Sequence, residues 1–117
     1  MSSITRIDAG PRMSQAVVHG DTVYVSGQVA LDAGGESVAA QTENILARID
    51  ALLHKAGTDK AKLLSASIWL ADIADFAEMN SVWDQWVAKD SAPARATVES
   101  KLAAPQFAVE IAAIAAR

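Results

Sequence analysis

The sequence contains no cysteine among its 117 residues. A chain without thiols has no disulfides, no thiolate metal ligands and no cysteine nucleophile. Basic residues are also in the minority, with 10 Lys and Arg against 14 Asp and Glu and a formal net charge of −4. Non-specific binding to nucleic acid needs a basic footprint, so this charge balance argues against it.

Long apolar runs are missing as well. No apolar segment approaches the roughly 18 residues of a membrane span. Residues 1–5 lack the basic and apolar segments of a secretory signal peptide, so we expect a cytoplasmic protein. The length fits one domain over residues 1–117. Hydrophobic residues make up 51% of the chain, more than a modest core needs, and oligomerisation would use the excess.

Two periodicities predict the secondary structure. Alternation predicts strands over residues 14–19, 22–29, 64–70, 96–100 and 107–115, with a tight turn at Gly20-Asp21. Apolar stripes predict helices over 38–56 and about 76–88. Gly57 is a natural stop for the first helix, and Asp75 with Glu78 resembles a capping box before the second. With one further strand before residue 14, whose bounds the pattern does not give, the order is β-β-β-α-β-α-β-β, which predicts a two-layer α+β domain with both helices on one face of a mixed sheet.

The other face of this sheet has a mixed character. Strict alternation assigns to it Thr22, Tyr24, Ser26, Gln28, Ser65, Ser67, Trp69, Ala108, Glu110, Ala112 and Ile114. Val23, Val25, Gly27 and Val29 are assigned to the core side. The outer set is too apolar for a plain solvent face and too polar for a sealed core. Our hypothesis is a subunit interface that contains clefts.

Two charged residues interrupt the strand-like runs near the end of the sequence. Glu110 lies within the apolar run 107–115, and Arg95 opens the run before it. As functional groups, Glu110 would be a general acid or base in a semi-apolar cleft, and Arg95 would bind a carboxylate with its planar fork. The pattern alone also allows a solvent-facing glutamate and a surface or salt-bridged arginine. Asn80, on a helical stripe with Phe76 and Trp83, is either a hydrogen-bonded structural amide or part of a site.

Other common site types find no support. Ser26 has no nucleophile elbow around it, and no motif connects it to His19 or His54, which argues against a serine hydrolase triad. The two histidines are far apart in sequence without ligand spacing, which argues against a metal site.

The sequence resembles a known family in five ordered segments. The chain is similar over essentially its whole length to the YjgF/RidA family, also called L-PSP endoribonuclease-like. The matching segments are Val25-Ser26-Gly27-Gln28-Val29, Gln41 with the helix to Ala56-Gly57, Asp75-Phe76-Ala77-Glu78-Met79-Asn80, Pro93-Ala94-Arg95-Ala96-Thr97-Val98-Glu99 and Val109-Glu110-Ile111-Ala112-Ala113-Ile114-Ala115.

The resemblance implies a fold, an assembly and an activity. It implies a chorismate-mutase-like protomer and a homotrimer with three ligand clefts between subunits. It also implies hydrolysis of enamines and imines, such as 2-aminoacrylate and its imine tautomer, to a 2-keto acid and ammonia without a cofactor or a metal. Arg95 matches the arginine that holds the substrate carboxylate, and Glu110 matches the glutamate that positions or activates water. Ser26 and Asn80 match the family's serine and asparagine near the cleft.

The sequence also departs from the family pattern. Met13 stands where many active members have tyrosine, Thr97 where many have cysteine, and Ala112 where a second glutamate is often found. The loop over residues 103–106 lacks the usual lysine. These departures suggest a divergent branch in which Met13 and Thr97 line an altered pocket. Two other functions stay open: a metabolite-binding trimer without turnover, and a ribonuclease or translation inhibitor, which the acidic balance disfavours.

Overall fold

The computed structural model describes residues 3–117, so two residues of the segment scanned for a signal peptide, Met1 and Ser2, lie outside it. Within this range the predicted order of strands and helices is confirmed. The elements are β1 (Ile4–Ala9), β2 (Ser14–His19), β3 (Thr22–Val29), α1 (Val38–Lys55), β4 (Leu63–Leu70), α2 (Phe76–Trp86), β5 (Ala94–Glu99) and β6 (Val109–Ala116), with short 3-10 turns η1 (Lys60–Lys62) and η2 (Ile73–Asp75).

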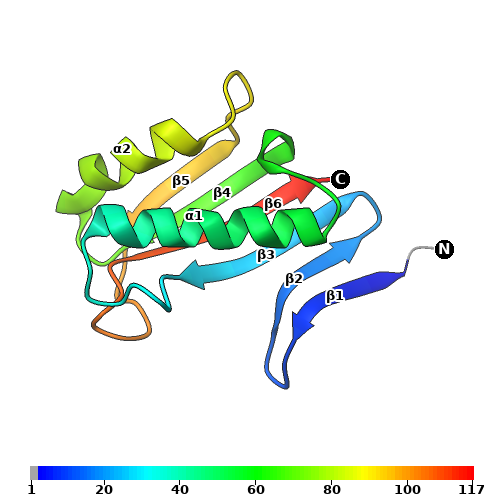
Figure 1. Ribbon diagram of the computed structural model, residues 1–117, viewed down its shortest axis with the longest axis horizontal. Coiled ribbons are helices and arrows are strands. Elements are labelled where there is room, and N and C mark those ends of the chain that lie inside the picture. The colour runs from blue at the N-terminus through cyan, green and yellow to red at the C-terminus, as the bar shows by residue number, and fades with distance from the viewer. Residues whose placement is uncertain (1–2) are drawn as a thin grey trace.

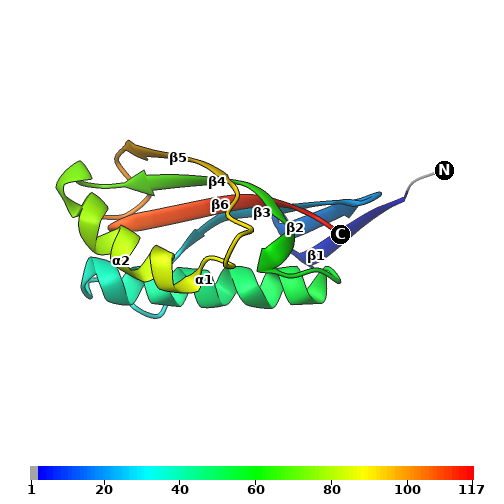
Figure 2. The same ribbon diagram turned by 90° about the horizontal axis from the view of Figure 1, so that it is seen from above.

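The strands form one six-stranded mixed sheet in the order β1-β2-β3-β6-β4-β5 (Figure 1). Neighbouring strands are antiparallel except β4 and β5, which are parallel. A parallel pair needs a long crossover, and α2 provides it. β6 therefore lies between β3 and β4 in the middle of the sheet. Both helices cover the same face, as predicted (Figure 2).

Local signals fix the ends of α1. The Ser37 hydroxyl accepts a hydrogen bond from the Ala40 N–H at 3.1 Å, which satisfies one of the unpaired donors of the first turn. Gly57 takes a φ of 83° directly after the C-cap Ala56, in a region that glycine enters at little cost. The apolar stripe of α1 packs against β3 and β6. The buried stripe includes Ile45, Leu46, Ile49, Leu52 and Leu53.

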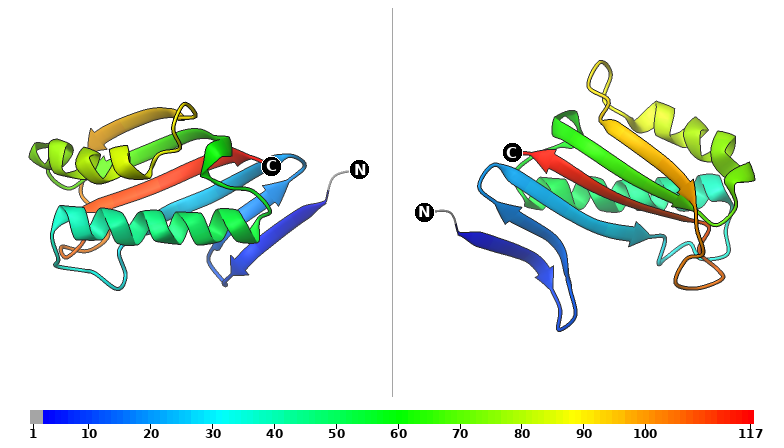
Figure 3. Two further views of the ribbon diagram at one scale, coloured as in Figure 1. Left: turned by 45° about the horizontal axis from the view of Figure 1, so that its top comes forward. Right: turned by 180° about the vertical axis from the view of Figure 1, so that it is seen from behind.

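The core lies between the helices and the sheet. Alternate residues of β6 point into it, and Val109, Ile111 and Ala115 are fully buried. Burying an aliphatic side chain of this kind stabilises the fold by about 1.5–3 kcal/mol. The opposite face of the sheet carries no helix (Figure 3). Large apolar side chains are about half exposed there, including Tyr24, Leu64 and Val98.

A β-bulge interrupts β3. Val25 lies opposite Ala113 of β6, whereas Gln28 lies opposite Ile111. Residues 26–27 therefore face a single residue of β6, so the strand carries one extra residue at this point. Since side-chain direction alternates along a strand, one extra residue exchanges the two faces beyond it.

The bulge corrects three predicted positions. Gln28 turns to the helix side and is only 5% exposed, although alternation placed it on the outer face. Val29 lies opposite Glu110 on the outer face rather than in the core. A side chain on Gly27 would likewise point at Glu110, not into the core. The prediction was wrong here because it assumed uninterrupted alternation.

Several element ends also differ from prediction. α1 ends one residue early, and α2 ends at Trp86 rather than residue 88, because Val87 has a ψ of 137° that breaks the helix. β5 begins at Ala94, which pairs with Ser65 of β4, rather than at residue 96. β6 begins at residue 109 rather than 107 because the Phe107 N–H bonds the preceding turn at Ala104 O.

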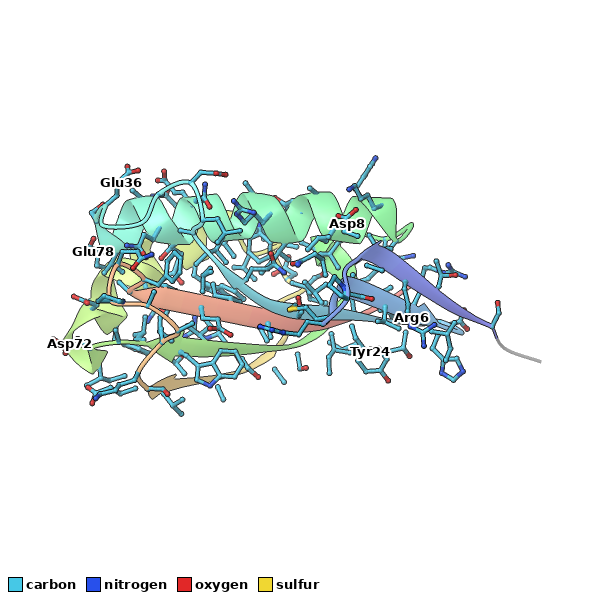
Figure 4. The ribbon with its side chains drawn as sticks, turned by 90° about the horizontal axis from the view of Figure 1, so that it is seen from below. Arg6, Asp8, Tyr24, Glu36, Asp72 and Glu78 are labelled. Carbon is cyan, nitrogen blue, oxygen red and sulfur yellow. The ribbon has the colours of Figure 1, made fainter. Side chains whose placement is uncertain are left out.

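The capping box predicted at the start of α2 does not form. Asp75 is the N-cap residue, but its side chain makes no capping hydrogen bond. The 3-10 turn η2 runs directly into α2 at this point. The Glu78 carboxylate instead accepts a hydrogen bond from the Ala39 N–H at 2.8 Å, so α2 caps the first turn of α1. Figure 4 shows Glu78 close to that end of α1.

Candidate functional site

Arg95 lies on the helix side of the edge strand β5. Its partner on β4 is the core residue Ala66, which fixes the direction of its side chain. The guanidinium carbon is 5.2 Å from the ring centroid of Trp83 and 5.8 Å from that of Phe76. Both rings come from one stripe of α2. Arg95 therefore lies between the sheet and α2 at the edge of the protomer.

The Arg95 guanidinium has no polar partner within the described chain. Among residues 3–117, the salt bridges are Arg48–Asp32 at 2.7 Å and Lys55–Asp8 at 3.0 Å, and neither involves Arg95. A guanidinium is permanently charged and carries five N–H donors in a planar fork. These donors are therefore available to an anion from outside the protomer.

Two buried polar atoms near Arg95 also lack hydrogen-bond partners. They are Asn80 Oδ1, one turn after Phe76 on α2, and Thr97 Oγ1, two residues after Arg95 on the same face of β5. Buried polar atoms are nearly always paired, so these two are open to a partner from outside the chain, such as water, a neighbouring subunit or a ligand. We call Phe76, Asn80, Trp83, Arg95 and Thr97 the Arg95 cluster.

Glu110 lies on the other face of the sheet. Its neighbours across the strands are Trp69 of β4 and Val29 of β3. The carboxylate occupies the space over Gly27, where an added Cβ would collide with Glu110 Oε2 and lie 3.0 Å from Cδ. A glycine at this point of the bulge is thus what allows the carboxylate to lie flat against β3.

The bulge itself is held by a buried amide. Gln28 Nε2 donates to the Gln15 side chain at 2.9 Å, to Ser26 Oγ at 3.1 Å and to Ser26 O at 3.2 Å. These bonds fix the Ser26 hydroxyl beside the glycine that Glu110 covers. Sequence reasoning missed Gln15, and it misplaced Gln28. A polar residue within a strand-like run was the signal that could have found this network.

A second buried amide holds the loop that leads into β6. Gln41 is 1% exposed, and its Nε2 donates to Glu36 O and Gln106 O, both at 3.0 Å. Its Oε1 accepts from the Ala108 N–H at 2.8 Å. Ala108 lies two residues before Glu110, so α1 sets where β6 starts. The signal for this role was an amide inside an apolar helical stripe.

One protomer brings together only part of the predicted site. Asn80 and Thr97 join Arg95, as described. Met13 lies in the β1–β2 turn at the opposite edge of the sheet and is 47% exposed. Glu110 is separated from Arg95 by the sheet itself.

The outer face of the sheet has a hollow beside β6, the strand that carries Glu110. It measures about 250 Å³ and is lined by Ala112 together with Tyr24, Ser65, Ser67 and Ile114. Figure 4 shows Tyr24 on the side of the sheet away from α1. Ala112, where the family resemblance led us to expect a second glutamate, therefore opens onto a shallow, largely apolar depression.

Residues 3–117 show no sign of two other kinds of site. In that range no three His, Asp or Glu side chains gather closely enough to hold a metal ion. None of the helices in the same range combines the length and apolar character needed to cross a membrane.

The fold defines the class: a two-layer, chorismate-mutase-like α+β protein with a bare, partly apolar sheet face. A family model described as endoribonuclease L-PSP matches residues 3–117. The chain belongs to this family, the YjgF/RidA family, as the sequence resemblance indicated.

Individual relatives cover nearly the whole chain. It is 47% identical over 115 residues to the RutC family protein YoaB of Escherichia coli K12, and the matched region covers 97% of this chain and 98% of that protein. It is 38% identical over 107 residues to a Bos taurus protein named 2-iminobutanoate/2-iminopropanoate deaminase, covering 87% of this chain and 77% of that one. A crystal structure of a YjgF family member from Neisseria meningitidis has a TM-score of 0.95 at 45% identity, covering 98% and 95% of the two chains.

Proposed function

We propose that the protein hydrolyses reactive 2-imino acids and their 2-enamine tautomers to 2-keto acids and ammonia, at sites between the subunits of a homotrimer. The observation that carries this proposal is the Arg95 cluster, in which the guanidinium has no polar partner among residues 3–117 and shares its face with two buried polar atoms that are unpaired in the same range. Similarity to a bovine protein named as a 2-iminobutanoate/2-iminopropanoate deaminase supports the substrate class.

Arg95 holds the substrate carboxylate. Its fork matches a carboxylate with two parallel N–H···O bonds, which fixes orientation as well as position. In every 2-imino acid the carboxylate is attached directly to the carbon that water attacks. Binding the carboxylate therefore also places the reacting carbon, with Asn80 and Thr97 beside it.

The reaction needs two copies of the chain. Within one protomer the sheet separates Arg95 from Glu110, so one substrate molecule cannot contact both. A complete site pairs the Arg95 cluster of one subunit with the Glu110 face of the next. The half-exposed apolar side chains Tyr24, Leu64 and Val98 support the bare sheet face as the contact surface.

Glu110 acts as general base toward one water molecule. The carboxylate takes a proton from water as the water oxygen bonds to the iminium carbon, and the C=N electron pair moves to nitrogen. The resulting carbinolamine takes this proton on its amino group. Ammonia leaves as the hydroxyl gives its proton to the Glu110 carboxylate and the carbonyl forms, and Glu110 then passes this proton to the ammonia or to solvent. An imine is already electrophilic, so orientation and general-base help supply the acceleration.

The pocket wall sets which imines are accepted. Ser26 contributes a hydroxyl fixed by Gln28, and Met13 adds a flexible apolar side chain in place of a phenol. Together with Ala112 in place of a second glutamate, Met13 makes this wall less polar than the usual family pattern, while Thr97 places a hydroxyl where many members have a thiol. We expect bulkier or more apolar 2-imino acids to be preferred over the smallest ones.

The test is amino-acid oxidase turnover coupled to trapping of the imine by semicarbazide. The protein is expected to lower semicarbazone formation for at least one amino acid. Glu110→Gln is expected to lower kcat by about 10²–10⁴-fold, and Arg95→Lys to raise KM because the fork is lost. Arg6→Lys, on the exposed edge strand β1, is the matched control and keeps wild-type rates.

Two outcomes would redirect the proposal. Binding of a keto acid without faster imine loss for any amino acid indicates a metabolite-binding trimer. Salt-sensitive RNA binding by a nuclease-free preparation would instead favour the ribonuclease function. Sedimentation is expected to give about three times the chain mass of 12.3 kDa. A monomer at micromolar concentration contradicts the site between subunits.

A further inference from the structure

We propose that Phe76 and Trp83 are positioning residues for Arg95. Two aromatic rings, rather than a carboxylate, hold the guanidinium, at 5.8 Å and 5.2 Å from their centroids. The proposal deepens the proposed function and rests on it only where substrate kinetics are used.

The choice of support determines what Arg95 can bind. A carboxylate partner would occupy the N–H donors of the guanidinium, because ion pairs form in the plane of the fork. An aromatic ring attracts a cation through its face, so this support consumes no N–H donor. Among residues 3–117 no carboxylate lies within salt-bridge distance of Arg95. The arginine is thus restrained while its donors stay open to an anionic ligand.

The two rings are held in different ways. Trp83 is 6% exposed and packs on Trp86, with ring centroids 5.3 Å apart, so it belongs to the core. Phe76 is 42% exposed at the first position of α2 and lies outside the hydrophobic core. Core packing explains Trp83 but not Phe76. The contact with Arg95 gives this exposed ring a function.

The expected effect follows from the strength of such contacts. A cation–π contact contributes about 0.5–2 kcal/mol depending on desolvation, which corresponds to about a 2- to 30-fold change in binding. The substrate carboxylate is bound equally in the ground state and the transition state. Loss of one ring should therefore raise KM and leave kcat nearly unchanged.

The decisive variant is Phe76→Leu, because an exposed position tolerates the change without unfolding. We expect KM for the imine and Kd for pyruvate, used as a carboxylate probe in calorimetry, to rise by about 2- to 30-fold. Phe76→Tyr and Trp83→Phe each keep an aromatic face, so KM and Kd should stay near their wild-type values. Leu31→Ala, which shortens an exposed apolar side chain beside Asp8 and Gln15 instead of in the Arg95 cluster, is the matched control.

A second measurement does not depend on any ligand. The Nε–H resonance of Arg95, identified by its loss in Arg95→Lys, should be shifted upfield by the ring currents in the NMR spectrum. Phe76→Leu should move it toward the position of an ordinary arginine, and Phe76→Tyr should not. An unchanged resonance and an unchanged Kd in a folded Phe76→Leu variant would overturn the positioning role.

The two proposals can fail separately. If the resonance moves in Phe76→Leu but the wild-type protein neither binds pyruvate nor hydrolyses imines, the positioning role stands and the proposed function fails. If the wild-type protein is an active deaminase whose Arg95 resonance shows no ring-current shift, the proposed function stands and the positioning role fails.

Discussion

Replacing Gly27 by alanine should lower activity while leaving the free energy of unfolding nearly unchanged. The added Cβ would collide with Glu110 Oε2 and lie 3.0 Å from Cδ and 3.3 Å from Cγ. Carbon atoms in contact prefer about 3.5–4.0 Å. The Glu110 carboxyl group must therefore withdraw by about 0.5–1 Å, and its colliding oxygen must move further.

The folded state should tolerate this change. Gly27 is not among the residues with positive φ, so alanine fits its backbone, and the substitution reduces unfolded-state entropy by about 0.4–1 kcal/mol in favour of folding. A displaced rotamer of Glu110 costs about 0.5–1.5 kcal/mol. The net change in the free energy of unfolding is then within about 1 kcal/mol of zero. A base misplaced by about 1 Å, in contrast, can lower kcat by about 10²-fold.

The assay combines urea unfolding with trapped-imine kinetics on the same preparation. Gly10→Ala is the matched control, since a Cβ there meets only Met13 O at an ordinary 3.5 Å. In a Glu110→Gln background, Gly27→Ala should lower kcat no further, because the displaced group has already lost its function. Full activity of a folded Gly27→Ala variant would refute the assigned position of the base.

Three further predictions concern the scaffold. Gln41→Leu removes three hydrogen bonds to backbone groups and should lower the free energy of unfolding in urea by about 2–4 kcal/mol; a loss below 1 kcal/mol would contradict its role in holding the loop. Thr58→Val removes a 2.6 Å bond to a β6 carbonyl and should cost about 1 kcal/mol in the same measurement, with no change meaning that the bond adds nothing. Burial raises the pKa of Asp75 first, and the charges of Asp72 and Glu78 raise it further. The folded protein therefore binds this proton more tightly than the unfolded chain, and stability is lost as pH rises through the raised pKa. Asp75→Asn should therefore match wild type in melting temperature at pH 3 and exceed it at pH 7, and an equal difference at both pH values would contradict this linkage.

Periodicity was sufficient to locate every strand and α-helix except β1, because burial imposes it and β1 is mostly exposed. The stripe of α1 and the alternation of β4 and β6 follow directly from having one face in the core. Glycine positions also carried local information, since the Gly20-Asp21 turn joins β2 to β3 and Gly57 ends α1 with positive φ. The order of elements and the layer architecture could therefore be predicted without any tertiary information.

The bulge could not be predicted in this way. It exists because Ser26 and Gly27 together oppose one residue of β6, a relation between strands that are some 80 positions apart in sequence. Gln28 consequently changed faces, although its residue type is typical of an exposed position. Local sequence specifies which residues are apolar, but the partner strand decides where a register shift occurs.

The candidate site shows the same limit. A charge within an apolar run was enough to single out Arg95 and Glu110. Their placement on opposite sides of the sheet depends on the pairing of β5 with β4, which no local pattern contains. The ring contacts of Arg95 were missed for the same reason, because Phe76 and Trp83 read only as parts of a helical stripe.

The central position of β6 has a consequence for synthesis of the protein. β6 follows the other five strands in sequence, yet it joins the β1-β2-β3 half of the sheet to the β4-β5 half. While the ribosome is still making β5, strands β3 and β4 each expose an unpaired edge beside a growing apolar surface. The nascent chain thus cannot close its sheet early, and cooperative folding must wait until β6 has emerged from the exit tunnel. Chaperones that shield apolar nascent segments are most needed in that interval.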